Sequence, residues 1–327
     1  MKTSWQLPRI VRFLIGGLAV CIGLSNAMAD DRPITIIVPY PAGGGSDTVA
    51  RSMGRLLSPV LGQPVAVENI SGAGARIGFQ TLMRAAPDGL RLLLATSDLT
   101  INQALRNPPP WNIDRDFSYL AVVGTAGLVY MVNNNVPAKN MLEFVEYARK
   151  RAKDGKPVNY GSGGVGSILH LPTLELAAKH NLEMTHIPYR GAAPLVPALG
   201  SGEVELGVVN PVNAVGHEGR MRALAITGPR RHPMLPNVPT MAEAGFPDVS
   251  STSFIAVIGP AKMPADVAAR LVAALEKVAA TDDFKKSMTA AGIEPGWVAG
   301  PALFPYIAAD LNKWRDLSVK SGVTLQD

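Results

Sequence analysis

The chain has 327 residues, of which 47% are apolar and 17% charged, and its formal net charge at pH 7 is +5. Aromatic residues make up only 6%, and no basic run is longer than Arg230–His232, so the composition does not support nucleic-acid binding. The single cysteine, Cys21, excludes a disulfide framework. Stability must therefore come from apolar cores, and the length is sufficient for about two domains.

The first 29 residues are predicted to be a cleaved signal peptide. Three cations precede the apolar run Phe13–Leu24, which is too short for a membrane span, and Ala27–Ala29 is an A-x-A cleavage site. We expect cleavage after Ala29 and export, which lowers the net charge to +2 because the removed segment holds no acid. The residues before Cys21 match a lipoprotein signal only loosely, so its lipidation stays open. No later apolar run reaches about 18 residues, and we expect a soluble mature chain.

Strand-like and helix-like segments alternate almost throughout the rest of the chain. Runs of β-branched and apolar residues predict strands at 34–38, 64–70, 91–96, 119–132, 158–160, 184–189, 204–209 and 222–227. Apolar residues spaced by three and four predict helices at 47–61, 75–86, 141–153, 167–180, 192–199, 265–280, 283–291 and 302–319. This alternation is typical of an α/β protein with mainly parallel sheets. The proline-rich segment 229–247 is predicted to be an irregular surface connection.

Three of the predicted strand-to-helix turns are rich in glycine and serine, namely residues 39–47, 71–74 and 161–167. Bare backbone at a helix N-terminus presents unpaired N–H groups and a partial positive charge, which together suit an anion. In open α/β sheets, ligands lie outside the carboxyl ends of the strands, so such loops from two domains can face each other across a cleft. The sequence therefore predicts a binding site for a small anion.

Several polar residues near these loops have two interpretations. Gly161, Gly163 and Gly166 match the G-x-G-x-x-G pattern of dinucleotide-binding loops, but the match stands alone and export separates the chain from cytoplasmic nicotinamide pools. Arg190, at the end of the next strand, either meets a ligand carboxylate through its planar fork or forms a surface ion pair. His170 either lines the cleft or is a hydrogen-bonded structural histidine.

Catalytic and metal-binding patterns are not found in the sequence. The five histidines show no metal-ligand spacing, no G-x-S-x-G elbow occurs, and Ser46, Ser71, Ser162 and Ser167 have no evident base partner. We therefore expect no metal, no cofactor and no nucleophilic catalysis. Asn210, just past the predicted strand 204–209, either binds a ligand or only ends the strand.

The chain resembles the substrate-binding receptors of tripartite tricarboxylate transporters, the Bug or TctC-like family, from about residue 33 to 322. The resemblance rests on the order and spacing of the following segments: YPAGGGSDTVAR (40–51), VENISGAGARIG (67–78), APDG (86–89), YGSGGVGSILHL (160–171), IPYRGAAP (187–194), SGEVELG (201–207), RALAIT (222–227) and PNVPTMAEAGFP (236–247).

This resemblance implies a type II-like periplasmic-binding-protein fold: two α/β domains joined by two crossing strands, with the ligand cleft between them. Domain 1 would be discontinuous, residues 30–128 plus 254–327, and domain 2 would be residues 129–253. Carried over from the family, the carboxylate-binding residues would be Tyr40, Ala42, Gly43 and Gly44 on one side and Ser162, Gly163, Gly166, Ser167 and His170 on the other. Ser71, Ala73, Thr96, Ser97, Tyr189, Arg190 and Asn210 would complete the pocket.

Two positions depart from the family pattern. Many relatives carry an acid after the strand that matches 204–209, where this chain has Asn210, and an aromatic residue such as tryptophan is common where this chain has Ser253-Phe254. An amine-recognising pocket is therefore disfavoured.

From the resemblance we expect a monomeric periplasmic receptor that captures a small organic carboxylate by domain closure and delivers it to membrane permease subunits. It would perform no chemistry. An exported α/β enzyme that uses the Gly-rich loops as an anion or oxyanion site is one alternative. An orphan receptor that feeds a signalling protein is another.

Overall fold

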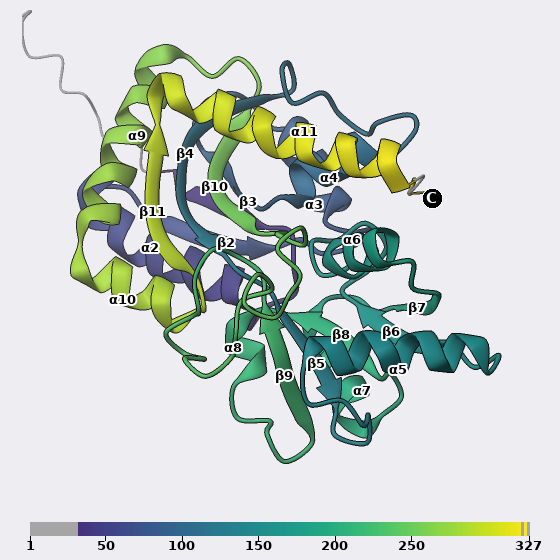
Figure 1. Ribbon diagram of the computed structural model, residues 1–327. Helices are drawn as coiled ribbons and strands as arrows, with labels where there is room; N and C mark the ends of the chain where they lie inside the picture. The colour runs from purple at the N-terminus through teal and green to yellow at the C-terminus, as the bar shows by residue number, and fades with distance from the viewer. Residues whose placement is uncertain (1–31, 322–323, 326–327) are drawn as a thin grey trace, which may run out of the picture. The chain divides into compact units, whose positions relative to one another are not determined.

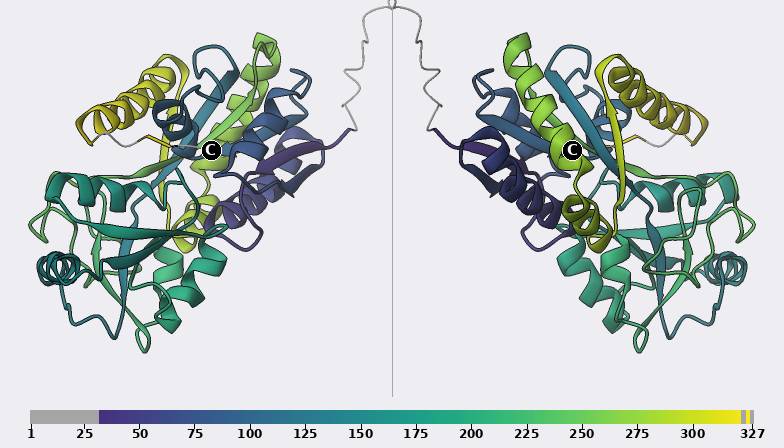
Figure 2. Two further views of the ribbon diagram at one scale, coloured as in Figure 1. Left: turned by 90° about the vertical axis from the view of Figure 1, so that its right-hand side faces the viewer. Right: turned by 90° about the vertical axis from the view of Figure 1, so that its left-hand side faces the viewer.

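In the computed structural model, which describes residues 32–321, 324 and 325, the chain builds two β-sheets, each accompanied by helices (Figure 1). The predicted signal peptide, with Cys21 and the cleavage after Ala29, lies outside the described residues. Among the described residues, those before about 127 and those after about 253 lie together, beside the residues between them, as both views in Figure 2 show. We refer to the six-stranded sheet and its helices as lobe 1 and to the five-stranded sheet and its helices as lobe 2.

The sheet of lobe 1 has the strand order β11-β4-β10-β3-β1-β2. Its strands are β1 (Ile34–Val38), β2 (Val65–Asn69), β3 (Arg91–Ala95), β4 (Phe117–Ala126), β10 (Ser253–Pro260) and β11 (Glu294–Ala299). Strand β1 is parallel to β2 and β3, whereas β10 is antiparallel to β3 and β4, and β11 is antiparallel to β4. The expectation of mainly parallel sheets is thus wrong for this half of the sheet, because the returning strand β10 enters it in the opposite direction.

The sheet of lobe 2 has the order β7-β6-β8-β5-β9. Its strands are β5 (Val129–Asn133), β6 (Val158–Ser162), β7 (Met184–Pro188), β8 (Leu206–Val209) and β9 (Met221–Ile226). Strand β6 is parallel to β7 and β8, and β5 is antiparallel to β8 and β9. This sheet is mixed too, because β5 arrives from lobe 1 and β9 leaves toward it.

The single long strand predicted over residues 119–132 is wrong, because the structure divides it into β4 and β5 at Gly127 and Leu128. A Cβ atom on Gly127 would lie 2.5 Å from the carbonyl oxygen of Thr227, so only glycine permits this close approach. The Leu128 N–H donates to Thr227 Oγ1 at 2.8 Å. The chain therefore crosses from lobe 1 to lobe 2 at this point, and it returns through residues 227–252, which form the irregular connection predicted from their prolines.

Helices cover both sheets. Those of lobe 1 are α2 (Gly45–Leu61), α3 (Arg76–Met83), α4 (Asp98–Leu105), α9 (Ala265–Ala280), α10 (Asp282–Ala290) and α11 (Leu303–Ser321), the last preceded by the short 3₁₀ turn η1 (Gly300–Ala302). Those of lobe 2 are α5 (Met141–Lys153), α6 (Leu171–His180), α7 (Ala192–Ser201) and α8 (Pro211–Ala214). In the described part of the chain, none of these helices has the length and apolar character that crossing a membrane requires.

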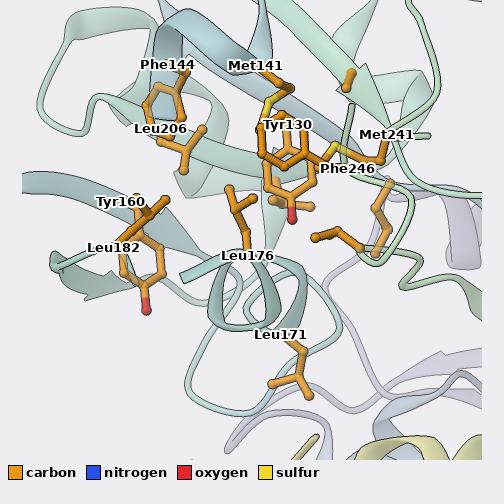
Figure 3. Packing of buried hydrophobic residues seen from close by; sticks show 14 of the residues in the cluster. Tyr130, Met141, Phe144, Tyr160, Leu171, Leu176, Leu182, Leu206, Met241 and Phe246 are labelled. Carbon is orange, nitrogen blue, oxygen red and sulfur yellow. The ribbon is translucent and has the colours of Figure 1, made fainter. Parts of the chain in front are cut away.

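The core of lobe 2 continues into lobe 1. Tyr130 of β5, Phe144 of α5 and Leu206 of β8 belong to one apolar cluster (Figure 3), which also includes Ile101 of α4 and Trp314 of α11. All five side chains are fully buried. Burial of this kind contributes roughly 1.5–3 kcal/mol per large apolar side chain, so one side of the contact between the lobes is held by core packing.

By their contacts, the residues from Arg32 onward form one compact unit. The division of the chain into domains at 128/129 and 253/254 therefore stays a prediction, although β5 begins at Val129 and β10 begins at Ser253.

Candidate functional site

A cavity of about 170 Å³ lies between the lobes, and we refer to it as the inner cavity. Lobe 1 contributes Tyr40 and residues 41–46 of the β1–α2 turn, and lobe 2 contributes the loop after β6 and the N-terminus of α7. The carboxyl ends of parallel strands from both sheets thus face one space, as the topology of open α/β sheets favours.

The β1–α2 turn forms the lobe 1 wall. Gly44 is the N-cap of α2, and no side chain caps this helix end. The Gly43 N–H is already bound, since it donates to Asp47 Oδ2 at 2.9 Å. Although desolvation opposes it, hydrogen bonds from Arg51 and from the Gly43 N–H lower the pKa of Asp47. A negative charge in the first turn stabilises the helix and leaves the amides of Gly45 and Ser46 at its positive end.

Asp98, in the first turn of α4, lies at the boundary between the lobes and is fully buried. Its Oδ2 accepts a hydrogen bond from the Tyr40 hydroxyl at 2.6 Å, and its Oδ1 accepts one from the backbone N–H of Ile168 at 2.5 Å. Burial raises the pKa of Asp98 to about 6, even though these donors favour the ionised form. Burial, followed by the charge of Asp98, raises the pKa of Tyr40 well above its ordinary value.

The lobe 2 wall carries an unpaired hydroxyl. Ser167 is 5% exposed and lines the inner cavity, and its Oγ atom has no hydrogen-bond partner within residues 32–321, 324 and 325. Buried hydroxyls without partners are rare in folded proteins. Gly191, Ala192 and Ala193 at the start of α7 form the adjoining part of this wall.

A second cavity of about 570 Å³, the outer cavity, adjoins the inner one. Both are lined by Tyr40, Pro41, Asp98, Gly163, Ser167 and Gly191. The outer cavity also carries three arginines, Arg76, Arg106 and Arg190.

Most of the predicted site residues line one of the two cavities. The inner cavity has Tyr40, Ala42, Gly43, Gly44, Thr96, Gly163, Ser167 and Asn210, and the outer cavity has Tyr40, Ser71, Ala73, Gly163, Ser167, Tyr189 and Arg190. Four predicted residues line neither cavity, namely Ser97, Ser162, Gly166 and His170. Ser97, Ser162 and His170 are buried at other positions in the core.

His170 belongs to a stack of rings behind the β6–α6 loop. Its ring centroid lies 3.9 Å from that of His186, which in turn lies 4.9 Å from that of Tyr160. Its Nε2 lies 3.1 Å from the Tyr160 hydroxyl, and its Nδ1 accepts from the Gly166 N–H at 3.2 Å. Burial, with His186 adding to it, lowers the pKa of His170 to about 3. Of the two interpretations that the sequence offered for His170, these contacts favour a hydrogen-bonded structural histidine.

The β6–α6 loop uses its amides internally. The Gly164 N–H donates to Ser162 Oγ, the Gly166 N–H to His170, and the Ser167 N–H to the Gly164 carbonyl. A dinucleotide loop needs such amides for the pyrophosphate, so the G-x-G-x-x-G match does not form that kind of site here.

Ser162 has a base partner that the sequence did not reveal. Its Oγ lies 2.7 Å from His186 Nε2. Burial lowers the pKa of His186 to about 4. The Ser162 side chain is fully buried and lines neither cavity, so this pair has no access to a substrate. Among the described residues, no group of three or more His, Cys, Asp or Glu side chains is placed to hold a metal ion.

The sequence did not identify Asp98, Ile168 or the N-terminus of α7 as parts of the site. An acid after a strand at the start of a helix reads as an ordinary N-terminal residue, and nothing local indicates that its partner is an amide 70 positions away. Gly191 next to Arg190 was the available signal for α7, since glycine often precedes a helix that starts close to a ligand.

Two α/β lobes with a cavity between them define a protein of the periplasmic-binding-protein class. Residues 49–323 match the tripartite tricarboxylate transporter family receptor. The chain therefore belongs to that family, and the resemblance and fold class expected from the sequence are confirmed.

Similar proteins of known sequence or structure agree. The chain is 32% identical over 319 residues to the UPF0065 protein in the tcbD-tcbE intergenic region of Pseudomonas sp. (strain P51), covering 94% of each chain. The structure of periplasmic binding protein BugD is similar with a TM-score of 0.83 and 30% identity, over 90% of this chain and 99% of that one.

Two similar structures contain ligands. MatC from Rhodopseudomonas palustris with bound malate has a TM-score of 0.79 and 28% identity, over 88% of this chain and 98% of that one. R. palustris Rpa4515 with adipate has a TM-score of 0.81 and 26% identity, over 90% and 99%. The family and its structural neighbours are solute-binding proteins of the periplasm.

Proposed function

We propose that this protein is a periplasmic receptor that captures a small organic carboxylate between its lobes and delivers it to the membrane subunits of a tripartite transporter. One observation carries the proposal: residues 40–46 of lobe 1 and Gly163, Ser167 and residues 191–193 of lobe 2 surround the same cavity. A ligand that touches both lobes favours their closed arrangement, which is how such a receptor signals that it is loaded.

The chemistry of the cavity supports an anionic ligand. The α2 N-terminus supplies amides and a partial positive charge, and the Ser167 hydroxyl supplies a donor that no described residue uses. The malate and adipate bound by two structural neighbours are carboxylates, which supports the same ligand class for this chain.

The remaining parts of the proposal rest on the family. A signal peptide ending at Ala29 would export the chain, domain 1 would comprise residues 30–128 and 254–327, and domain 2 would comprise residues 129–253. The receptor would act as a monomer without a cofactor, and permease subunits would be its protein partners. Ligand residues would be those of the predicted set that line either cavity.

A thermal-shift screen against small carboxylates tests the proposal. A ligand present at a hundred times its Kd stabilises the native state by about 2.7 kcal/mol, which raises the melting temperature measurably. Sugars and amines of similar size are the controls, and we expect no shift from them. If no acid shifts the melting temperature, the receptor proposal fails.

An exported hydrolase is the alternative, and the Ser162–His186 pair is the observation that raises it. Because Ser162 is fully buried, we propose that the protein is not an enzyme. Incubation with activated esters tests this directly: hydrolysis that Ser162→Ala abolishes would favour the enzyme.

A further inference from the structure

We infer that the inner cavity takes an acid with one carboxylate and an apolar body, and that Asp98 is the residue that turns away a second carboxylate. This inference rests on the proposed receptor function and specifies its ligand. Two structural neighbours hold the dicarboxylates malate and adipate, so the inference assigns this chain a preference that differs from the ligands in those two structures.

The inner cavity offers a place for a carboxylate between the start of α2 and Ser167. The amides at the start of α2 and the unpaired Ser167 hydroxyl are donors at its surface. A carboxylate accepts hydrogen bonds at both oxygens and needs several such donors once it leaves water.

No second place with compensating charge exists in this cavity. Among the lining residues that the structure describes there is no lysine, arginine or histidine, and the one charged side chain among them is the acid Asp98. An ionised carboxylate buried without a cation or donors is strongly disfavoured. A dicarboxylate placed wholly in the inner cavity would have one of its charges uncompensated.

Asp98 adds a repulsive element at the passage to the outer cavity, since it lines both. Both of its oxygens already accept hydrogen bonds, from Tyr40 and from the Ile168 N–H, so they are engaged within the protein. A second ligand carboxylate beside this acid would place like charges together in a poorly solvated space, and specificity is often built from such repulsion.

Apolar side chains form much of the remaining wall, beside the polar side chains of Asn210, Asn213 and Ser253. Lobe 1 contributes Ala126, Ile255 and Ile293, and lobe 2 contributes Ile168 and Leu169. Ile255, Ile293, Ile168 and Leu169 are all buried. An engineered apolar cavity of about 150 Å³ holds benzene, so the 170 Å³ here suits an acid with a body of about that size.

Calorimetry with matched pairs of acids tests the inference. The pairs are benzoate with terephthalate and hexanoate with adipate, each at pH 7.5 and constant ionic strength. We expect the monocarboxylate of each pair to bind about tenfold or more tightly than its partner, given like charges a few ångströms apart in a poorly solvated cavity. A dicarboxylate that binds as tightly as its monocarboxylate partner, or more tightly, overturns the inference.

Asp98→Asn tests the assigned residue. The substitution removes the charge and keeps the size, so the dicarboxylates should gain more affinity than the monocarboxylates and the ratio within each pair should fall by several-fold. If the affinity ratio within each pair is unchanged, Asp98 does not discriminate against the second carboxylate. The comparison in the unsubstituted protein needs no variant, so it stands even if Asp98→Asn does not fold.

Arg190→Ala distinguishes a failure of this inference from a failure of the proposed receptor function. If adipate binds more tightly than hexanoate and Arg190→Ala abolishes that preference, the second carboxylate reaches the outer cavity, and the inference fails while the receptor proposal stands. If none of the four acids and no acid in the wider screen binds, the receptor proposal fails and the inference falls with it.

Discussion

The carboxylate of Asp98 and the backbone N–H of Ile168 form a hydrogen bond of 2.5 Å across the boundary between the two lobes. Asp98 starts helix α4 beside the six-stranded sheet, and Ile168 lies in the loop that follows β6 of the five-stranded sheet. This bond closes one side of the inner cavity without any ligand. The same carboxylate also accepts a hydrogen bond from the Tyr40 hydroxyl. A change in its protonation state therefore alters hydrogen bonds to both lobes.

The first prediction concerns Asp98 and pH. Its pKa is about 6 in the folded protein and near 3.8 when unfolded, so the folded state binds the extra proton and is stabilised at low pH. This contribution is complete below pH 4 and is lost as the pH rises to about 6. Relative to Asp98→Asn, the unsubstituted protein should lose about 3 kcal/mol of unfolding free energy over that window.

Urea unfolding of both proteins between pH 4 and pH 7.5 measures this difference. Tyr40, which donates to Asp98, has a raised pKa that keeps it neutral throughout this range. A difference between the two proteins that does not change with pH would show that the pKa of Asp98 is the same in the folded and the unfolded protein.

The second prediction has the opposite sign and concerns His170. Burial lowers its pKa to about 3, so the folded protein keeps the ring neutral while the unfolded chain protonates it below pH 6.5. Stability from this residue is present above pH 6.5 and falls as the pH drops toward 3. The unsubstituted protein should lose about 1.4 kcal/mol per pH unit relative to His170→Asn in this range.

Acid unfolding followed by near-ultraviolet circular dichroism is the appropriate measurement, because Tyr160 lies in the same stack of rings. Parallel stability profiles for the two proteins would contradict the neutral, buried state of His170.

The third prediction uses Ser167 and Ser162 as a matched pair. Ser167 Oγ has no partner among the described residues, whereas Ser162 Oγ lies 2.7 Å from His186 Nε2. Ser167→Ala should therefore leave unfolding free energy unchanged or slightly higher, and it should weaken carboxylate binding by about 1.5–3 kcal/mol, the usual contribution of a hydrogen bond to a charged group. Ser162→Ala should lower stability with a smaller effect on affinity.

Calorimetric titration and thermal unfolding of both variants separate these effects. Equal losses of affinity, or a loss of stability in Ser167→Ala, would mean that the Ser167 hydroxyl serves the fold and not the ligand.

The fourth prediction concerns the β1–α2 turn. A Cβ atom on Gly45 would lie 2.9 Å from the carbonyl oxygen of Ala291, so Gly45→Ala must displace this turn. We expect carboxylate affinity to fall about tenfold, or about 1.4 kcal/mol, because the first amides of α2 move away from the ligand. Gly219→Ala is the control, since a Cβ atom there meets nothing within 4 Å. Equal affinities of the two variants would place the ligand away from α2.

The strand–loop–helix units were predictable because their cores follow local patterns. Val49, Met53 and Leu57 of α2 are buried at spacings of four residues, as the sequence indicates. Helix α4 was missed because its buried residues include Asp98, Thr100 and Asn102, which removes the amphipathic pattern. Strand β11 was missed because Pro295 and Gly296 stand inside it.

The site was only partly predictable for a similar reason. Glycine-rich turns indicate where a backbone approaches a ligand, and Tyr40, Gly43 and Gly163 accordingly line the inner cavity. The roles of Asp98 and Ser167 depend on contacts made or left unmade across the lobes, which no local pattern records.

The most direct test is a crystal structure of the protein with the acid that binds most tightly in the screen. The account predicts a carboxylate in the inner cavity, with one oxygen within about 3 Å of Ser167 Oγ and hydrogen bonds from the first amides of α2. A ligand held only by the outer cavity, or a carboxylate placed among the apolar side chains away from Ser167, would contradict it.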